Sequence, residues 1–226
     1  MSYIGVITGD IVNSTGILKS GHREKMLDIL KNTIAEFNLI NQCHDIKMEI
    51  YRGDAFQIII KKPTIAVELA IIIRTALIAS SQNGIRWDAR LGIGVGEGEF
   101  IADSIAESDG EAFHKSGSAF DTLDKNSRMA VVVPDNDFSD ELTITTAFAD
   151  DIISNWTETQ AAAIYPALIK SSTQKDLAEI LGKSPQAISK LLSTSKLSLI
   201  LNYIRRFQYK IELYNSQKKK KKKKLT

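Results

Sequence analysis

The spacing of hydrophobic positions changes several times in the first half of the chain. Residues 3–9 form a short run rich in Ile and Val, which is typical of a buried strand, whereas residues 23–37 carry apolar side chains at helical spacing. Residues 46–51 and 55–61 are further strand candidates, separated by a turn at 52–54 in which glycine supplies an unusual backbone angle. These patterns predict a strand, a helix and then a β-hairpin.

A second helix and a fourth strand complete the pattern. Pro63 can begin a helix that continues to Ile78, and residues 89–95 again have the composition of a strand. The resulting order, βαββαβ, is that of a ferredoxin-like or polymerase-palm domain, an α+β fold with an antiparallel sheet and both helices on one face. In this topology the first and third strands are antiparallel neighbours, so Asp10 and Asp54 should meet at one edge of the sheet.

The rest of the chain changes in texture after Trp156. Before this point, residues 129–133 and 142–146 are predicted as two more strands with a turn at 134–137 between them. After it, the sequence consists of helical segments rich in alanine and leucine. The predicted division has three parts: a palm-like, cyclase-like domain over residues 1–150, an all-α helix-turn-helix domain over 151–217, and a lysine-rich disordered tail over 218–226.

The all-α part has the spacing of a helix-turn-helix between residues 174 and 193. Small Ala178 allows the two helices to touch, and Gly182 allows the sharp turn between them. Thr173 and Ser184 are the predicted N-caps. The second helix would enter the major groove of double-stranded DNA, although the same hairpin also serves for protein contacts. The candidate DNA-binding residues are Ser184, Gln186, Ser189 and Lys190.

Charge divides unevenly along the chain, although its formal net charge is only +2. Residues 1–155 carry 14 basic and 23 acidic groups, whereas residues 156–217 carry 8 basic and 4 acidic groups. A basic small domain favours the phosphate backbone of DNA, and an acidic domain needs a cation between itself and a nucleotide. The lysine run at 218–224 suits either a nucleic-acid arm or a solvated appendage.

The remaining composition indicates a cytoplasmic protein that does not cross a membrane. A single cysteine, Cys43, excludes an internal disulfide and a zinc ribbon. The N-terminal segment lacks the basic and apolar regions of a secretory signal. The longest apolar stretch, at residues 65–79, contains Glu68 and Arg74 and is too short to span a bilayer.

Two Gly-Asp pairs, Gly9-Asp10 and Gly53-Asp54, lie where predicted strands end or begin. Mg²⁺ takes oxygen ligands and is usually held by one or two carboxylates together with phosphate oxygens. Because the topology brings Asp10 and Asp54 together, we expect them to bind Mg²⁺ or Mn²⁺ with a nucleotide. Each aspartate alone could also be an ordinary turn residue.

Glycine alternates at residues 92, 94, 96 and 98. This is not a dinucleotide-binding fingerprint, because Glu97 stands where G-x-G-x-x-G requires its last glycine. Glycines two apart leave one face of a strand bare. The pattern therefore permits close approach of a helix, a second subunit or a ligand.

Four ordered motifs resemble the SatD family of bacterial proteins. The resemblance covers about residues 3–125 and continues into the C-terminal helix-turn-helix. The motifs are Gly9-Asp10-Ile11-Val12-Asn13-Ser14, Gly53-Asp54-Ala55-Phe56-Gln57, Arg90-Leu91-Gly92-Ile93-Gly94-Val95-Gly96 and Asp109-Gly110-Glu111-Ala112-Phe113-His114.

The same motifs resemble class III nucleotide cyclases, whose first metal-binding aspartate lies in an Asp-Ile-Val segment and whose second follows a glycine in a hairpin. The hairpin here also resembles the Gly-Gly-Asp-Glu-Phe hairpin of diguanylate cyclases, with Arg52 and Ala55 as departures. The resemblance implies a site for a purine nucleotide and a divalent metal. Its metal-binding residues would be Asp10, Ile11 and Asp54, and its nucleotide-binding residues Gly9, Asn13, Ser14 and Gly53.

In cyclases a glycine-led helix supplies an asparagine and an arginine that contact the nucleotide. Alignment of Gly110 with that glycine places His114 at the asparagine and Ser118 at the arginine. Loss of such an arginine could cost about 10³ to 10⁵ in rate, judged from arginine fingers, unless His114, Lys115 or a partner chain supplies the catalytic group instead. Because cyclase folds pair head to tail, the resemblance also implies a homodimer.

Three functions are compatible with these features. The first is a DNA-binding transcriptional regulator whose palm-like domain binds a purine nucleotide with Mg²⁺. The second is an active Mg²⁺-dependent nucleotidyl cyclase or oligonucleotide synthase that makes a signalling nucleotide. The third is an interaction protein in which the palm-like domain is a scaffold.

Overall fold

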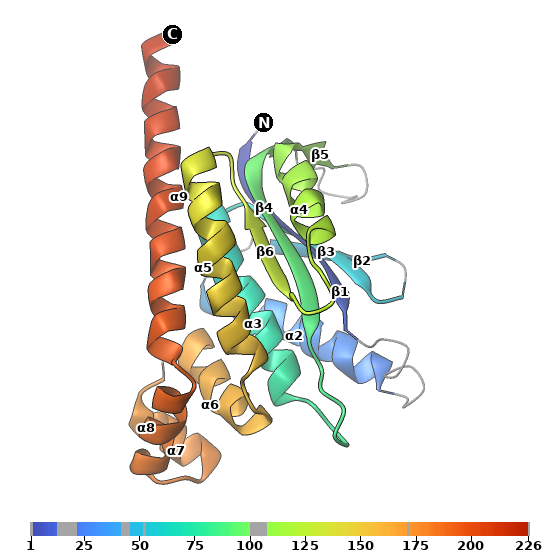
Figure 1. Ribbon diagram of the computed structural model, residues 1–226, viewed down its shortest axis with the longest axis vertical. Helices are drawn as coiled ribbons and strands as arrows, with labels where there is room; N and C mark the ends of the chain where they lie inside the picture. The colour runs from blue at the N-terminus through green and yellow to red at the C-terminus, as the bar shows by residue number, and fades with distance from the viewer. Residues whose placement is uncertain are drawn as a thin grey trace.

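The computed structural model describes residues 2–12, 22–41, 46–51, 53–99, 108–170 and 172–225. These residues form an α+β fold around one sheet (Figure 1). Strand β1 (Ser2–Ile11) lies between β3 (Ala55–Ile60) and β4 (Ala89–Glu99) and is antiparallel to both. The strand order is β2-β3-β1-β4-β5, where β2 is Ile46–Ile50 and β5 is Asp109–Gly110, and β6 (Met129–Val132) pairs with β4 in parallel.

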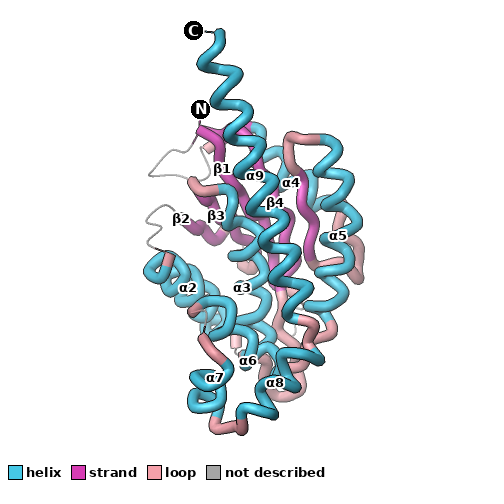
Figure 2. Tube along the Cα trace, turned by 90° about the vertical axis from the view of Figure 1, so that its left-hand side faces the viewer, coloured by secondary structure: helices cyan, strands magenta, loops and turns pink. Residues whose placement is uncertain are grey.

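Helices surround this sheet on both faces. Helices α2 (Arg23–Ile40) and α3 (Ala66–Ala79), the latter after a 3₁₀ turn η1 (Pro63–Ile65), share a core with one face. Helix α4 (Glu111–Asp121) packs on the opposite face. The C-terminal part consists of α5 (Asn136–Ser154), α6 (Glu158–Ile169), α7 (Gln174–Leu181), α8 (Pro185–Thr194) and the long α9 (Leu197–Leu225), with α7 and α8 together at one end (Figures 1 and 2).

The predicted βαββαβ order is confirmed, and the burial of each helix explains its sequence. Helix α2 is amphipathic, since its buried side chains recur every three or four residues from Met26 to Phe37. Helix α3 is buried on nearly all sides because it lies between the sheet and the outer helices α6 and α9. Arg74 is therefore inside the molecule, where two aspartates pair with it, whereas Glu68 is partly buried and accepts a hydrogen bond from Gln208 of α9.

The alternating glycines of β4 are explained by helix packing. A Cβ atom at Gly94 would lie 2.3 Å from the backbone oxygen of Ala112 and from the backbone nitrogen of Ser116, and one at Gly92 would lie 2.3 Å from the backbone nitrogen of Phe120. Helix α4 thus lies directly on the bare face of β4. Of the three occupants that the sequence left open, the helix is the one found here.

The predicted strand at residues 142–146 is wrong, because this segment lies within α5. The predicted turn before it instead begins the helix: the side chain of Asp135 accepts a hydrogen bond from the backbone N–H of Phe138 and caps α5. The buried side chains of α5 recur every three or four residues, which suits a helix and outweighs the strand preference of a run rich in Thr and Ile. They are Phe138, Leu142, Thr146, Ala149 and Ile153.

One hydrophobic core extends from the sheet into the C-terminal helices. The buried cluster that contains Ile58 and Leu91 also contains Ile164 of α6 and Phe207 of α9. Helices α7 and α8 instead have a small cluster of their own around Leu177, Ala178 and Ile188, partly shared with α6. No helix in the described ranges is both long enough and apolar enough to span a bilayer.

Candidate functional site

The ends of three neighbouring strands bring the predicted aspartates together. Asp10, near the end of β1, lies opposite Ala55 of β3 on one side and opposite Arg90 of β4 on the other. Asp54 immediately precedes Ala55, in a turn where Gly53 has a φ of +68°. The two residues are far apart in sequence but lie at the same end of the sheet, as the βαββαβ topology predicts.

Arg90 forms the centre of this end of the sheet. Its Nε donates to Oδ1 of Asp10 at 2.9 Å, and its second nitrogen donates to Oδ2 in a short hydrogen bond. Its guanidinium also lies over the ring of Phe120, 5.2 Å from the centroid. The hydrogen bond to Asp10 raises the pKa of Arg90 above its ordinary value, and the charges of Asp10 and Asp54 add to this effect. We call these three residues the Asp10–Asp54–Arg90 cluster.

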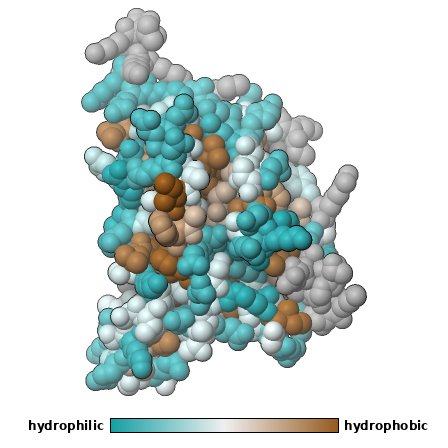
Figure 3. All heavy atoms as spheres, in the orientation of Figure 1, coloured by the Kyte–Doolittle hydropathy of each residue, from teal (hydrophilic) through white to brown (hydrophobic). Residues whose placement is uncertain are grey.

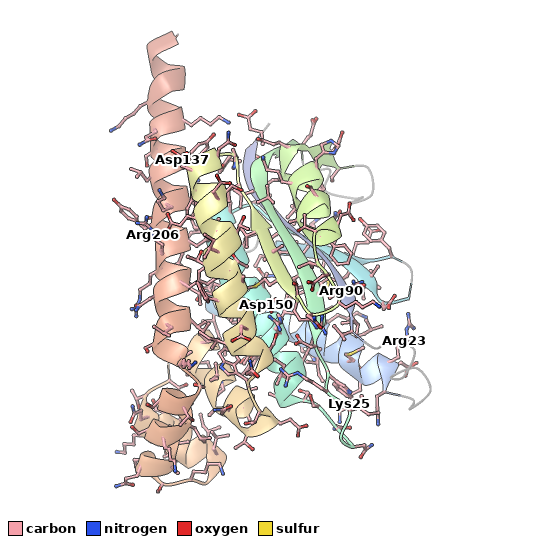
Figure 4. The ribbon with its side chains drawn as sticks, in the orientation of Figure 1. Arg23, Lys25, Arg90, Asp137, Asp150 and Arg206 are labelled. Carbon is pink, nitrogen blue, oxygen red and sulfur yellow. The ribbon has the colours of Figure 1, made fainter. Side chains whose placement is uncertain are left out.

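The cluster is open to solvent. The side chains of Asp10 and Arg90 are 22% and 35% exposed. Arg90 is labelled in Figure 4, on the side of the molecule opposite α9. A guanidinium in such a position can exchange a carboxylate for a ligand from solution at a lower cost than in the interior, because solvent screens a partly exposed ion pair.

A polar row continues from the cluster along the same face of the sheet. Gln57 donates to the hydroxyl of Thr8 at 3.2 Å and accepts from the hydroxyl of Tyr51 at 3.2 Å. The hydroxyl of Thr8 also lies 2.9 Å from that of Ser116 on α4. Beyond Thr8 the face becomes apolar, with Ile4 and Val6 buried under α4. The sheet therefore presents hydrogen-bonding groups beside the charged cluster and an apolar surface only where α4 covers it.

Arg23 fixes the turn that carries Asp54. From the first turn of α2, its guanidinium donates to the backbone oxygen of Gly53 at 2.5 and 3.2 Å. Figure 4 shows Arg23 and Arg90 on the same side of the molecule. Sequence reasoning assigned no role to either arginine, although Arg90 opens one of the motifs quoted above. The signal that could have identified Arg90 is the antiparallel register of the first and fourth strands, which places it opposite Asp10.

The predicted metal ligands form a partial site. The part of the chain that the structure describes has no group of three or more His, Cys, Asp or Glu residues that could hold an ion. Asp10 and Asp54 fit an ion that arrives with a nucleotide, since Mg²⁺ is commonly held by one or two carboxylates plus phosphate oxygens. Both oxygens of Asp10 already accept from Arg90, so an ion would either use their remaining lone pairs or displace that arginine.

The other predicted ligands of this site are buried, exposed or outside the described residues. Ile11 pairs with Ala89 in the sheet, and its side chain is buried in the core. Gly9 is also buried, and a Cβ atom there would collide with the ring of Phe56. Gly53 is exposed in the turn, whereas Asn13 and Ser14 lie outside the described residues.

His114 and Lys115 are not brought to the cluster. Helix α4 begins at the far end of β4, where Gly98 pairs with Gly110, and runs back along the strand. The backbone of Lys115 lies against Gly94, which is four residues, or about 13 Å at 3.3 Å per residue, from Arg90 along β4. The amine of Lys115 lies 3.7 Å from Glu111, and the exposed His114 lies 3.3 Å from Asp109. Within one chain, the two predicted catalytic side chains are therefore paired toward the far end of β4 and not with the aspartates.

Helices α7 and α8 present the four predicted DNA-binding residues to solvent. Thr173 and Asp176 form a capping box at the start of α7, Gly182 ends it with a left-handed backbone, and Ser184 caps α8. The side chain of Ile188 is buried between the two helices, so the opposite side of α8 faces outward. The exposed residues there include Ser184, Gln186, Ser189 and Lys190.

The chain belongs to the SatD family, whose sequence profile matches residues 3–213. A search of curated proteins gave no match.

Several solved structures are similar in fold. They include the active GGEEF domain of a diguanylate cyclase from Vibrio cholerae, with 18% identity over 58% of this chain and 83% of that chain and a TM-score of 0.41. An adenylate cyclase from Trypanosoma brucei in its monomeric state is 16% identical over 59% of this chain and 73% of that chain, with a TM-score of 0.40. The guanylate cyclase domain of RhGC from Catenaria anguillulae, in complex with GTP, is 17% identical over 57% of this chain and 78% of that chain, also with a TM-score of 0.40.

Proposed function

We propose that the chain is a DNA-binding transcriptional regulator that binds a purine nucleotide with Mg²⁺ or Mn²⁺ at the Asp10–Asp54–Arg90 cluster. The observation that carries the nucleotide site is the pairing of Arg90 with Asp10 at a partly open end of the sheet where Asp54 also lies, close enough for its charge to raise the pKa of Arg90. A single aspartate there could be a turn residue. Two carboxylates with an exchangeable arginine have the charges that a metal-bound phosphate requires.

Each residue has a distinct role in this proposal. Asp10 and Asp54 would hold the ion, which supplies positive charge between the carboxylates and the phosphates. Arg90 can donate the same two hydrogen bonds either to Asp10 or to a phosphate oxygen, since a guanidinium fork matches both groups. Gln57 and Tyr51 offer donors and acceptors next to the cluster for the polar edge of a ligand.

Equilibrium binding by calorimetry tests the nucleotide site. We expect at least one purine nucleotide to bind only when Mg²⁺ is present, and Asp54→Asn to weaken this binding by at least about tenfold, because even groups that only support a metal ligand cost 10- to 100-fold. Asp28→Asn, at an exposed position of α2, is the matched control and should leave the affinity unchanged. Binding that Asp54→Asn does not weaken would refute the assignment.

The DNA-binding part of the proposal is supported by the exposed side of α8 and the net basic charge of residues 156–217. Few basic residues lie on α8 itself, so one copy would bind weakly and two copies on adjacent half-sites would bind better. For the nucleotide to regulate DNA binding, it must bind two arrangements of the protein with different affinity.

Fluorescence anisotropy on DNA selected from a random pool tests this part. Lys190→Ala should weaken binding and lower the slope of log affinity against log salt by about one, as loss of one phosphate contact does. Gln186→Ala should change which sequences are selected. Lys175→Ala on α7 is the control for a general loss of charge. If the random pool yielded no DNA that binds the protein, this part of the proposal would be wrong.

A second candidate, an active nucleotidyl cyclase or oligonucleotide synthase, is favoured by Arg90. The sequence alignment with cyclases leaves Ser118 where an arginine is needed, yet the fold places Arg90 beside both carboxylates. Incubation with radiolabelled purine triphosphates and Mn²⁺ separates the two candidates. A product that disappears in Asp54→Ala would make the protein an enzyme, whereas bound but unchanged nucleotide supports the regulator.

A further inference from the structure

An apolar strip on the outer helices has no covering element among the described residues. Ile144 and Phe148 of α5 are 62% and 68% exposed, and Leu199 of α9 is 54% exposed. Figure 3 shows these helices from outside, with apolar side chains gathered over their lower halves. A groove of about 540 Å³ runs between the two helices. Exposed apolar patches of this kind mark surfaces that bind another protein.

The charges around this strip differ between the two helices. Helix α5 contains five acidic residues and no basic one, and Asp140 and Asp151 are exposed on the side of the strip. Lys196, which precedes α9, and Arg206 within it are exposed on the other side. We define the α5–α9 surface as Asp140, Ile144, Phe148, Asp151, Lys196, Leu199 and Arg206.

The two helices run antiparallel, and their contacts fix which residues are level. The hydroxyls of Thr146 and Tyr203 are 2.6 Å apart. Arg206 donates to Glu141 at 2.9 Å. Because both helices rise 1.5 Å per residue, each step forward along α5 matches one step backward along α9. Phe148 is therefore level with Leu199, and Asp151 is level with Lys196.

We infer that this surface binds a second copy of the chain through a two-fold axis that runs parallel to α5 and α9, between them. Rotation about such an axis leaves the height of every residue along the helices unchanged. It places α5 of one subunit against α9 of the other. Phe148 then meets Leu199 of the partner subunit, and Asp151 meets Lys196 of the partner subunit. The four helices form an antiparallel bundle with an isologous interface.

Charge selects this axis over the alternative. A two-fold axis in the same plane but perpendicular to the helices would lay α5 on α5, with acidic residues opposite acidic residues. Like charges placed opposite each other across an interface cost several kilocalories per mole. The parallel axis instead pairs the acidic helix with the more basic one twice, once on each side of the axis.

The parallel axis also has a consequence for α7 and α8. Both lie beyond the N-terminal end of α9 (Figures 1 and 2). Two subunits related by this axis therefore present both α7–α8 pairs at the same end of the dimer, as two adjacent DNA half-sites require. Only this consequence depends on the proposed DNA binding. The surface itself lies away from the Asp10–Asp54–Arg90 cluster, on the other side of the molecule (Figure 4).

Sedimentation analysis of the full chain tests the dimer. We expect a dimer for the native sequence and a monomer for Phe148→Asp, with the melting temperature unchanged because Phe148 is mostly exposed. Leu39→Asp, at a residue of α2 that is 77% exposed, is the matched control and should remain dimeric. A native chain that sediments as a monomer, or a dimer that survives Phe148→Asp, would overturn the inference.

A charge swap tests the axis itself. Asp151→Lys alone and Lys196→Asp alone should each raise the dimer dissociation constant about tenfold, and the double variant should return it to within about threefold of the native value. Both changes suit their backbones: lysine is favourable in the last turn of a helix, and aspartate tolerates the left-handed conformation of Lys196, whose φ is +55°. A double variant as weak as the two single changes combined would exclude this axis, whatever the outcome of the nucleotide and DNA experiments.

Discussion

Two arginines, Arg74 and Arg90, each pair with aspartate, but in opposite surroundings. Arg74 is completely buried and donates to both oxygens of Asp88 at 2.9 Å and to Asp150 at 2.6 Å. Arg90 lies at the open end of the sheet beside Asp10 and Asp54. Because an isolated buried charge is expensive, the first group is fixed in the folded state, whereas the second can exchange its partner for a ligand.

Replacement of each arginine by methionine should separate these roles. Arg74→Met leaves two buried carboxylates without their cation and should lower the free energy of unfolding by about 3–5 kcal/mol. Arg90→Met breaks a partly exposed but bidentate pair and should cost less, about 1–2 kcal/mol. Urea denaturation measures both. An equally large loss for Arg90→Met would show that its pair with Asp10 is structural and not available to a ligand.

At the scale of elements, periodicity predicted the sheet and its two crossing helices, because each depends on a local pattern of apolar residues. It failed at α5, where Thr and Ile at residues 143–146 have strand preference but the burial repeat is helical. The glycine pattern of β4 predicted a close approach without naming the occupant, since that depends on α4, which packs on the strand from later in the chain. The pairing of Asp10 with Arg90 likewise depends on a register that local patterns do not contain.

Substitution by alanine should have opposite effects on stability at Gly94, which contacts α4, and at Gly117, which lies within it. Gly94→Ala forces a methyl group to within 2.3 Å of the α4 backbone and should cost about 1–3 kcal/mol or more. At Gly117, inside α4, a methyl group meets nothing within 4 Å, so alanine should stabilise the helix by about 0.5–1 kcal/mol. Thermal unfolding of both variants checks this, and a neutral Gly94→Ala would mean that α4 does not lie directly on β4.

At the scale of the whole molecule, the C-terminal helices do not form a uniform group. Helices α6 and α9 contribute to the same buried cluster as the sheet, whereas α7 and α8 have their own small cluster. A change in composition after Trp156 reveals the start of the helical part but not which helices share the core, since that depends on long-range packing. The predicted division at residues 150 and 151 stays a prediction about folding units.

Native-state hydrogen exchange tests that division. Amides of α7 and α8 should open with a lower free energy than those of α6 and α9, because few buried side chains hold the pair to the rest of the molecule. Amides of α6 and α9 should instead open together with those of α3 and the sheet. If α6, α7, α8 and α9 all opened as one unit, the helical part would be a separate domain as the sequence predicts.

The proposed binding of a divalent ion by Asp10 and Asp54, together with a purine nucleotide, can be observed through the ion itself. Electron paramagnetic resonance reports the state of Mn²⁺ when the protein is titrated with and without each purine nucleotide. We expect Mn²⁺ to bind tightly only when a nucleotide is present, and we expect Asp54→Asn to abolish this binding while Asp28→Asn preserves it. If Asp54→Asn left Mn²⁺ binding unchanged, or if no purine nucleotide promoted it, the two aspartates would not form the proposed site.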